Sequence, residues 1–257
     1  MSQYDWPAQD YAIGSFIQNT TADMFLGSLQ LDEATSVLDI GCGNGAYTTN
    51  ILKRVPKGSV LGIDSSESML ALAQELISTY SNFQLQQCDA ETMSFDGKFD
   101  QVVSFWCLQW THDIVKAFAN IYRALKPGGH VLTLFPAGDD PFINNYQKVR
   151  GSGDFACLEG FIPPMEYSQM QDLDSKLASL PFTNISVKNH HQSLTLPSID
   201  TYRKFVNGIA FYQGQLSDED RLAVNAAMVD VFDQECRERH QGAYVFDMHV
   251  YCITAEK

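Results

Sequence analysis

Short apolar runs alternate with stretches of helical spacing between residues 36 and 136. Buried strands are predicted at 37–40, 59–64, 82–89 and 130–136, together with a strand in 99–110 that continues into an aromatic loop. Between them, helices are predicted at 46–54, 66–80 and 113–126. This alternation is typical of βαβ units with right-handed crossovers, so we expect an α/β domain whose mostly parallel sheet has helices on both faces.

The pattern becomes irregular after residue 136. Glycine, aspartate and proline interrupt the regular pattern in 137–182. Because this segment and about 198–214 also contain many apolar residues, we predict that both are insertions that form an acceptor-binding cap over the sheet. Strand candidates at 184–196 and 244–257 flank a long helix at 217–239. We therefore expect residues 1–257 to form one domain. Its cap would contribute either a lid over an apolar ligand or an ordinary core, from Phe155, Phe161, Met165, Tyr167, Phe205, Phe211 and Tyr212.

Composition narrows the classes of partner and compartment. The net charge of −14 opposes binding to nucleic acid or to an anionic membrane surface. No basic and apolar leader opens the chain, and no apolar run approaches the roughly 18 residues of a membrane span. The six cysteines form no CxxC pair and no zinc-type cluster, so we expect reduced thiols and no metal. A cytoplasmic protein, monomeric or weakly dimeric, fits this composition.

The stretch "SVLDIGCGNGAY" at 36–47 carries the first chemical signal. Gly41, Gly43 and Gly45 follow a strand and precede a helix, where backbone N–H groups can approach a ligand. With Ala46, the loop also satisfies the G-x-G-x-x-G/A pattern of dinucleotide sites. The loop alone therefore leaves a nicotinamide-type oxidoreductase open.

Acidic residues at three successive strand ends favour a cationic ligand instead. Asp39 precedes the glycines, where it would repel a pyrophosphate but attract a sulfonium and an ammonium group. Asp64 ends the second strand, where an acid can accept both ribose hydroxyls, and Asp89 could accept from an adenine amino group. Caps of the following turns are the structural alternative for such aspartates.

The stretches "VLDIGCGNG", "GIDSSESML", "CDAETM", "FDQVVSFWCLQW" and "RALKPGGHVL" resemble, in order and spacing, the motifs of class I S-adenosylmethionine-dependent methyltransferases over about residues 36–135. The resemblance implies a Rossmann-like, seven-stranded sheet in the order 3-2-1-4-5-7-6 with strand 7 antiparallel. It also implies that the helical segment 1–32 covers the cofactor site. By position it implies methionine contacts from Gly41, Cys42 and Gly43, ribose contacts from Asp64, adenine contacts from Ser65, Asp89 and Ala90, and a floor from Phe105.

Two further stretches, "DYAIGSFIQ" and "SFWCLQWTHD", are similar to the juvenile hormone acid and trans-aconitate carboxyl methyltransferases. This resemblance implies that Gln18 and Trp110 hold an acceptor carboxylate, which an amide and an indole N–H can orient without an ion pair. Tyr11 could cover the methionine end of the cofactor.

The expected reaction is methyl ester formation on a small carboxylic acid with an apolar body. His112 is the candidate general base for the alternative, methylation of a hydroxyl, amine or carbon. A protein that binds S-adenosylmethionine without turnover is the remaining alternative.

Overall fold

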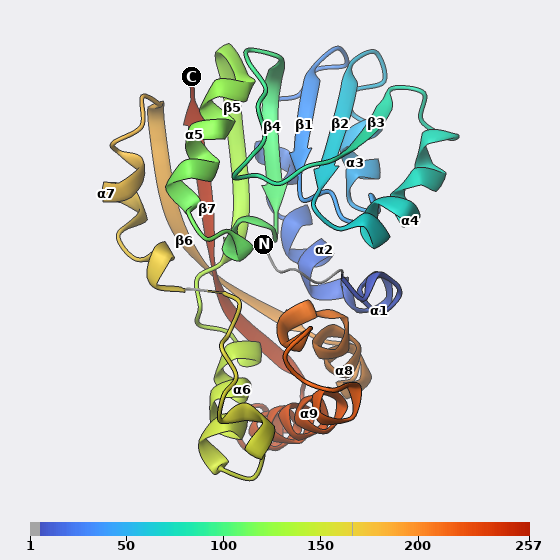
Figure 1. The fold of residues 1–257 in the computed structure, drawn as a ribbon, viewed down its shortest axis with the longest axis vertical. Helices are drawn as coiled ribbons and strands as arrows, with labels where there is room; N and C mark the ends of the chain where they lie inside the picture. The colour runs from blue at the N-terminus through green and yellow to red at the C-terminus, as the bar shows by residue number, and fades with distance from the viewer. Residues whose placement is uncertain (1–5, 166) are drawn as a thin grey trace.

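The computed structural model describes residues 6–165 and 167–257, and it contains a seven-stranded sheet in the order β3-β2-β1-β4-β5-β7-β6 (Figure 1). Strand β7 is antiparallel to both of its neighbours, and the other pairs are parallel. The predicted fold class and strand order are confirmed. The strands are β1 Ser36–Ile40, β2 Ser59–Asp64, β3 Phe83–Gln87, β4 Phe99–Phe105, β5 Leu125–Pro136, β6 Thr183–Thr195 and β7 Val245–Glu256.

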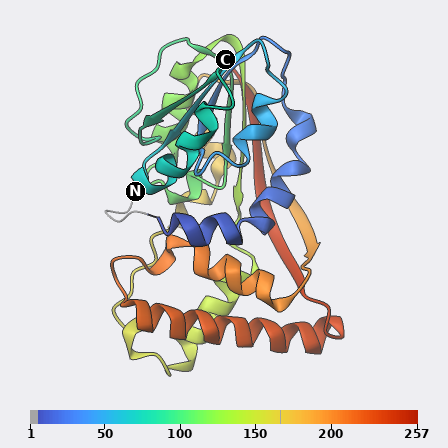
Figure 2. The same ribbon diagram turned by 90° about the vertical axis from the view of Figure 1, so that its right-hand side faces the viewer.

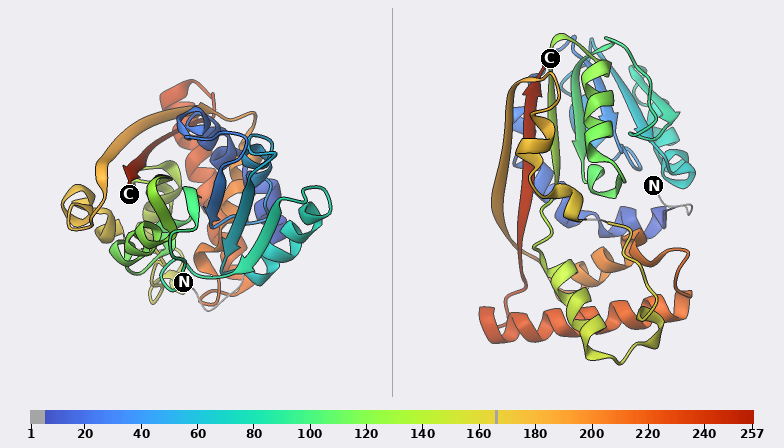
Figure 3. Two further views of the ribbon diagram at one scale, coloured as in Figure 1. Left: turned by 90° about the horizontal axis from the view of Figure 1, so that it is seen from above. Right: turned by 60° about the vertical axis from the view of Figure 1, so that its left-hand side comes forward.

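Helices cover both faces of the sheet, as the near-continuous apolar strands predict. On one face, α5 (Ile114–Ala124) and α7 (Leu173–Leu177) bury residues such as Phe118 against Leu38 and Val102. On the other face, α3 (Thr48–Leu52) and α4 (Glu67–Ile77) share a core with Val37 and Val60 (Figure 3). The central strand β1 is therefore buried on both sides, and its carboxyl end is the place where loops can form a site.

Element boundaries differ from prediction around the glycine loop and β5. The helix expected at 46–54 is the shorter α3, because Ala46 N–H is held by Asn44 Oδ1 in a turn before the helix starts. Strand β5 begins at Leu125 rather than at residue 130, since the Pro127-Gly128-Gly129 segment continues the strand. As expected, Ser66 caps α4 by accepting a hydrogen bond from Met69 N–H.

A cap lies below the sheet in Figure 1, and its boundaries correct the predicted insertions. It consists of α6 (Pro141–Ser152), α8 (Ile199–Gly208) and α9 (Asp218–His240), which pack against one another. Helix α9, which we expected to follow the βα pattern, joins the cap because Val224, Met228 and Phe232 pack into its aromatic core. Conversely, α7 belongs to the sheet although it lies within 137–182, since Leu173 and Leu177 pack beneath α5.

The N-terminal helices lie between the sheet and the cap, as Figure 2 shows in blue. Helix α1 (Ala8–Gly14) packs along α8, and α2 (Phe16–Asp23) follows it. The crossing is close, because a Cβ on Gly208 would lie 2.9 Å from Tyr11 Cα. Of the segment 1–32, residues 1–5 lie outside the described residues, and Tyr11 of α1 and Gln18 of α2 lie against the loops at the carboxyl ends of the strands.

Candidate cofactor and acceptor pockets

Contacts with two neighbouring strand ends hold the glycine loop after β1. Gly41 has a φ of +72°, and a Cβ there would lie 2.3 Å from Cys107 Cβ in the loop after β4. Gly43 N–H donates to Asp64 Oδ2, and Ser66 N–H donates to Asp64 Oδ1, both over 2.9 Å. The Asp64 carboxylate therefore organises the loop, and a side chain at position 41 would collide with its neighbour.

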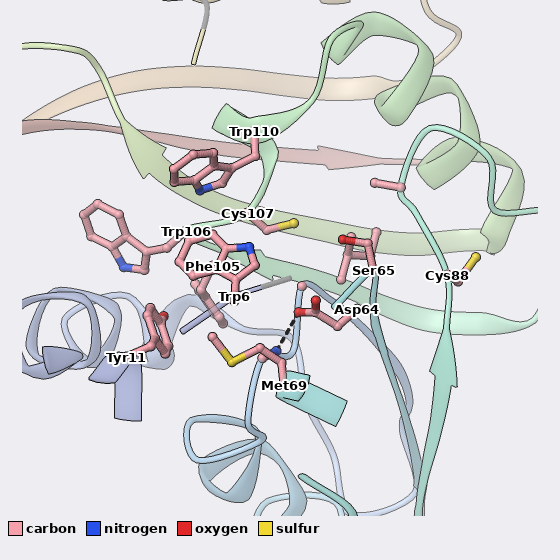
Figure 4. A pocket seen from close by; sticks show the side chains of 14 residues that line it. Trp6, Tyr11, Asp64, Ser65, Met69, Cys88, Phe105, Trp106, Cys107 and Trp110 are labelled. Atoms are coloured by element: carbon pink, nitrogen blue, oxygen red, sulfur yellow. Dashed lines mark hydrogen bonds between the residues drawn. The ribbon is translucent and has the colours of Figure 1, made fainter. Parts of the chain in front are cut away.

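A pocket with about 540 Å³ of empty space, partly open to solvent, lies beside this loop (Figure 4). We call it the loop pocket. A Cβ on Gly43 would approach Met69 Sδ and Tyr11 Cε1 only to 4.0 Å, so the loop backbone stays accessible from the pocket. Of the residues that the sequence assigns to the cofactor, those lining this pocket are Tyr11, Gly41, Gly43, Asp64, Ser65, Ala90 and Phe105.

Asp39 and Cys42 line an inner recess of about 450 Å³ that shares Gly41 and Gly43 with the loop pocket. The Asp39 side chain is 3% exposed and accepts a hydrogen bond of 2.7 Å from Thr48 Oγ1. Burial raises the pKa of this carboxyl from 3.8 to about 6, against the lowering effect of the Thr48 hydroxyl. Lysine, arginine and histidine are absent from the described residues that line the recess, and such a buried carboxylate suits a cationic group of a ligand.

Asp89 is the assigned cofactor residue that lines neither the loop pocket nor the inner recess. Its neighbours Cys88 and Ala90 do line the loop pocket. The Asp89 Oδ1 atom accepts from Glu91 N–H over 2.7 Å, which is the turn-capping geometry that we considered as the alternative. An adenine contact from this side chain stays a prediction.

A second pocket, with about 520 Å³ of empty space, lies between the sheet and the cap, and we call it the cap pocket. Its apolar walls come from α2, α6, α8, β7 and the segment before residue 166, and include Ile17, Phe142, Met165, Phe205, Phe246 and Met248. Four aromatic residues line both this pocket and the loop pocket: Trp6, Tyr11, Trp106 and Trp110. These shared rings therefore mark the boundary at which two ligands could meet.

Gln18 and Trp110, the two assigned acceptor residues, both line the cap pocket. Gln18 is 7% exposed, and its Oε1 atom is buried without a hydrogen-bond partner among the described residues. An unpaired buried amide oxygen costs free energy, about 1–3 kcal/mol, that a hydrogen-bond donor would recover. The structure thus places both residues in the lining of one pocket, and their contacts with an acceptor stay a prediction.

His112 lies apart from both pockets. Its side chain is exposed, and its backbone N–H donates to Glu91 Oε2 over 3.1 Å. It lines neither the loop pocket nor the cap pocket, so the geometry gives no support to its role as general base.

Sequence reasoning missed two pocket tryptophans, Trp6 and Trp106. Trp106 has a φ of +60°, a rare conformation for a bulky residue, and follows directly after β4. Its Nε1–H donates to the Gln18 carbonyl oxygen over 3.0 Å, which fixes the ring between the two pockets. The repeated tryptophan in "FWCLQW" was the available signal. All three tryptophans of the chain line both pockets.

Comparison with known proteins agrees with this geometry. The family described as "Methyltransferase domain" matches residues 37–129. Methyltransferase 235L of Invertebrate iridescent virus 6 is 37% identical over 56% of this chain, and the match spans only 54% of the viral protein. The malonyl-[acyl-carrier protein] O-methyltransferase of Marinomonas sp. is 31% identical, with 69% of this chain and 68% of that protein covered.

Two curated relatives carry the names that the stretches "DYAIGSFIQ" and "SFWCLQWTHD" suggested. The trans-aconitate 2-methyltransferase of Deinococcus radiodurans is 28% identical, over 82% of this chain and 81% of its own. The juvenile hormone acid O-methyltransferase of Drosophila melanogaster is 26% identical, with 73% of this chain and 68% of that protein covered.

Among solved structures, the YcgJ protein of Bacillus subtilis has a TM-score of 0.62 at 17% identity, with 93% of this chain and 98% of that one covered. This last likeness shows a shared fold.

Proposed function

Since this chain belongs to the class I S-adenosylmethionine-dependent methyltransferases, we propose that it transfers the cofactor's methyl group to a carboxylate oxygen of a small molecule with an apolar body. The observation that carries the proposal is the buried Gln18 side chain, which lines the cap pocket together with Trp110 beside the aromatic boundary of two adjoining pockets. The loop pocket would hold the cofactor and the cap pocket the acceptor.

The residues of the loop pocket fit the cofactor. Asp64, already fixed by two backbone N–H groups, presents a carboxylate for the ribose hydroxyls. Asp39 would face the cationic methionine part, and the open backbone at Gly43 leaves room for it. When bound, S-adenosylmethionine supplies an electrophilic methyl group on a positively charged sulfur.

The cap pocket would position the acceptor and exclude water. Gln18 N–H groups and the Trp110 indole N–H would orient the carboxylate, which needs no general base because it is ionised at pH 7. Methyl transfer from a sulfonium to a carboxylate neutralises two charges, so apolar walls destabilise the separated charges more than the transition state. Catalysis would therefore consist of in-line positioning and desolvation.

The names of three relatives support a carboxylate as the acceptor. The trans-aconitate and juvenile hormone acid enzymes are named for acids, and a third relative is an O-methyltransferase of malonyl-[acyl-carrier protein]. Identities of 26–31% leave the particular acid open.

A radiolabelled methyl-transfer screen over small carboxylic acids tests the proposal, with release of volatile methanol by base as the sign of an ester. Gln18→Glu should abolish transfer, because it faces the acceptor with a like charge. Gln30→Glu, the same change at an exposed position, should leave transfer intact. A base-stable labelled product, or full activity in Gln18→Glu, would overturn the carboxylate assignment.

A further inference from the structure

The cap pocket contains a carboxylate that the proposed reaction does not use. Asp140 lines this pocket and is 6% exposed. It caps α6, and its Oδ1 atom accepts from Phe142 N–H over 2.8 Å and from Ile143 N–H over 3.1 Å. Lysine, arginine and histidine are absent from the described residues that line the pocket, so no protein cation there neutralises Asp140.

A glutamine with an unsatisfied amide oxygen lines the same pocket. Gln109 is 6% exposed and uses its amide N–H on the Trp106 carbonyl oxygen, over 3.0 Å. Its Oε1 atom is buried without a hydrogen-bond partner among the described residues. Gln18 and Gln109, which both line the pocket, therefore each bury an amide oxygen that lacks a hydrogen-bond donor among the described residues.

An acceptor with only an apolar body and a carboxylate head offers no hydrogen-bond donor to Asp140, Gln109 or Gln18. Burial raises the pKa of Asp140 to about 6, so its carboxyl is largely ionised at neutral pH. A purely anionic ligand would then be repelled by Asp140 without compensation.

We propose that the acceptor carries, besides the carboxylate that is methylated, a hydrogen-bond donor group, a hydroxyl or a protonated amine, and that Asp140 is the specificity residue that binds it, with Gln109 as a further acceptor. The inference rests on the proposed function, because it assigns a substrate class to the same cap pocket.

The position of Asp140 favours binding over proton transfer. The residues that line both pockets are the four rings Trp6, Tyr11, Trp106 and Trp110, and Asp140 is not among them. Asp140 belongs to the cap wall, at the start of α6, so it faces the part of the acceptor away from the cofactor.

The test compares fatty acids from butanoic to dodecanoic acid with their ω-hydroxy and ω-amino counterparts. The kcat/KM of the wild type should favour a donor-bearing acid over the plain acid of equal length by about tenfold or more, as a charge-assisted hydrogen bond implies. Asp140→Asn keeps a good helix cap but removes the charge, so it should abolish the preference for ω-amino acids over plain acids of equal length. Comparing the ω-hydroxy acids with the ω-amino acids shows whether the pocket prefers a hydroxyl or a protonated amine.

Asp139→Asn is the matched control. The Asp139 side chain is 70% exposed, lies 3.4 Å from His249 Nδ1 and lines no part of the cap pocket. This variant should keep the wild-type preference. Absence of a preference at every chain length, or an equal preference in Asp140→Asn, would overturn the inference while methylation of plain acids would still support the proposed function.

Binding separates the two proposals if no acid is methylated. Because all three tryptophans line the pockets, their fluorescence reports occupancy without turnover. With S-adenosylhomocysteine present, decylamine and the ω-amino acids should bind wild type at least about tenfold more tightly than Asp140→Asn. That result would uphold the Asp140 assignment although the carboxylate reaction had failed, and equal affinities would refute it.

Discussion

Replacing Asp39 with asparagine should stabilise the ligand-free protein at pH 8 while it weakens cofactor binding. The folded protein raises the pKa of Asp39 from 3.8 to about 6 by burial, so ionisation is less favourable in the folded than in the unfolded chain. Because one pKa unit corresponds to about 1.4 kcal/mol, the buried charge costs about 3 kcal/mol at pH 8. The asparagine carbonyl can still accept from Thr48, so we expect a net gain of about 1–3 kcal/mol.

The sign of the pH dependence identifies the cause. A group with a raised folded pKa stabilises the fold below its unfolded pKa and loses that contribution as pH rises through its folded pKa. The advantage of Asp39→Asn should therefore be smaller at pH 5 than at pH 8 by about 1.4 kcal/mol. Urea unfolding of wild type and Asp39→Asn at the two pH values measures this difference. Burial also raises the pKa of Asp140, but this contribution is the same in both proteins and cancels in the comparison.

Calorimetry should show cofactor affinity about tenfold or more weaker in Asp39→Asn, since the recess loses the charge that faces the cationic methionine part. A variant that is less stable at pH 8, or whose gain does not change with pH, would refute the burial argument. Unchanged affinity would remove Asp39 from the cofactor site.

Three other substitutions test separate parts of the account. Asp64→Ala should weaken cofactor binding by about 1–3 kcal/mol in calorimetry, and unchanged affinity would contradict its ribose assignment. Trp110→Phe keeps bulk but removes the N–H, so steady-state kinetics should show a larger loss for the acceptor than calorimetry shows for the cofactor; equal losses would make Trp110 a wall alone. Gly208→Ala should cost about 1–3 kcal/mol of stability in urea unfolding by pushing α8 from Tyr11, whereas Gly160→Ala, with open space around it, should be neutral.

The sheet and most of the lining of the loop pocket could be predicted because their signals are local in the sequence. Each strand is a continuous apolar run, and the residues at its carboxyl end follow it directly. Asp39, Asp64 and the glycine loop therefore converge once the strands pair in parallel, as the observed registers show. Asp89 illustrates the limit, since the sequence gives the strand end but not the direction of the side chain.

The cap could not be predicted in the same way, because its residues meet only through tertiary packing. The periodicity of α9 indicates a helix but not which surface it packs against, and here it joins α6 and α8. Asp140 is one of two adjacent aspartates, and only the start of α6 turns it into the cap pocket while Asp139 faces His249. The Trp106 ring lies between the loop pocket and the cap pocket because its backbone has a positive φ, which bulky residues rarely adopt.

A comparison of three compounds with one apolar body tests the central claim most directly. Decanoic acid, decanol and decylamine are incubated in separate reactions with the enzyme and S-adenosylmethionine labelled in its methyl group, and the products are resolved by mass spectrometry. We predict methyl decanoate as the labelled product, because Gln18 and Trp110 can orient a carboxylate and no base is needed to activate it. A labelled ether or methylamine in place of the ester would contradict the account.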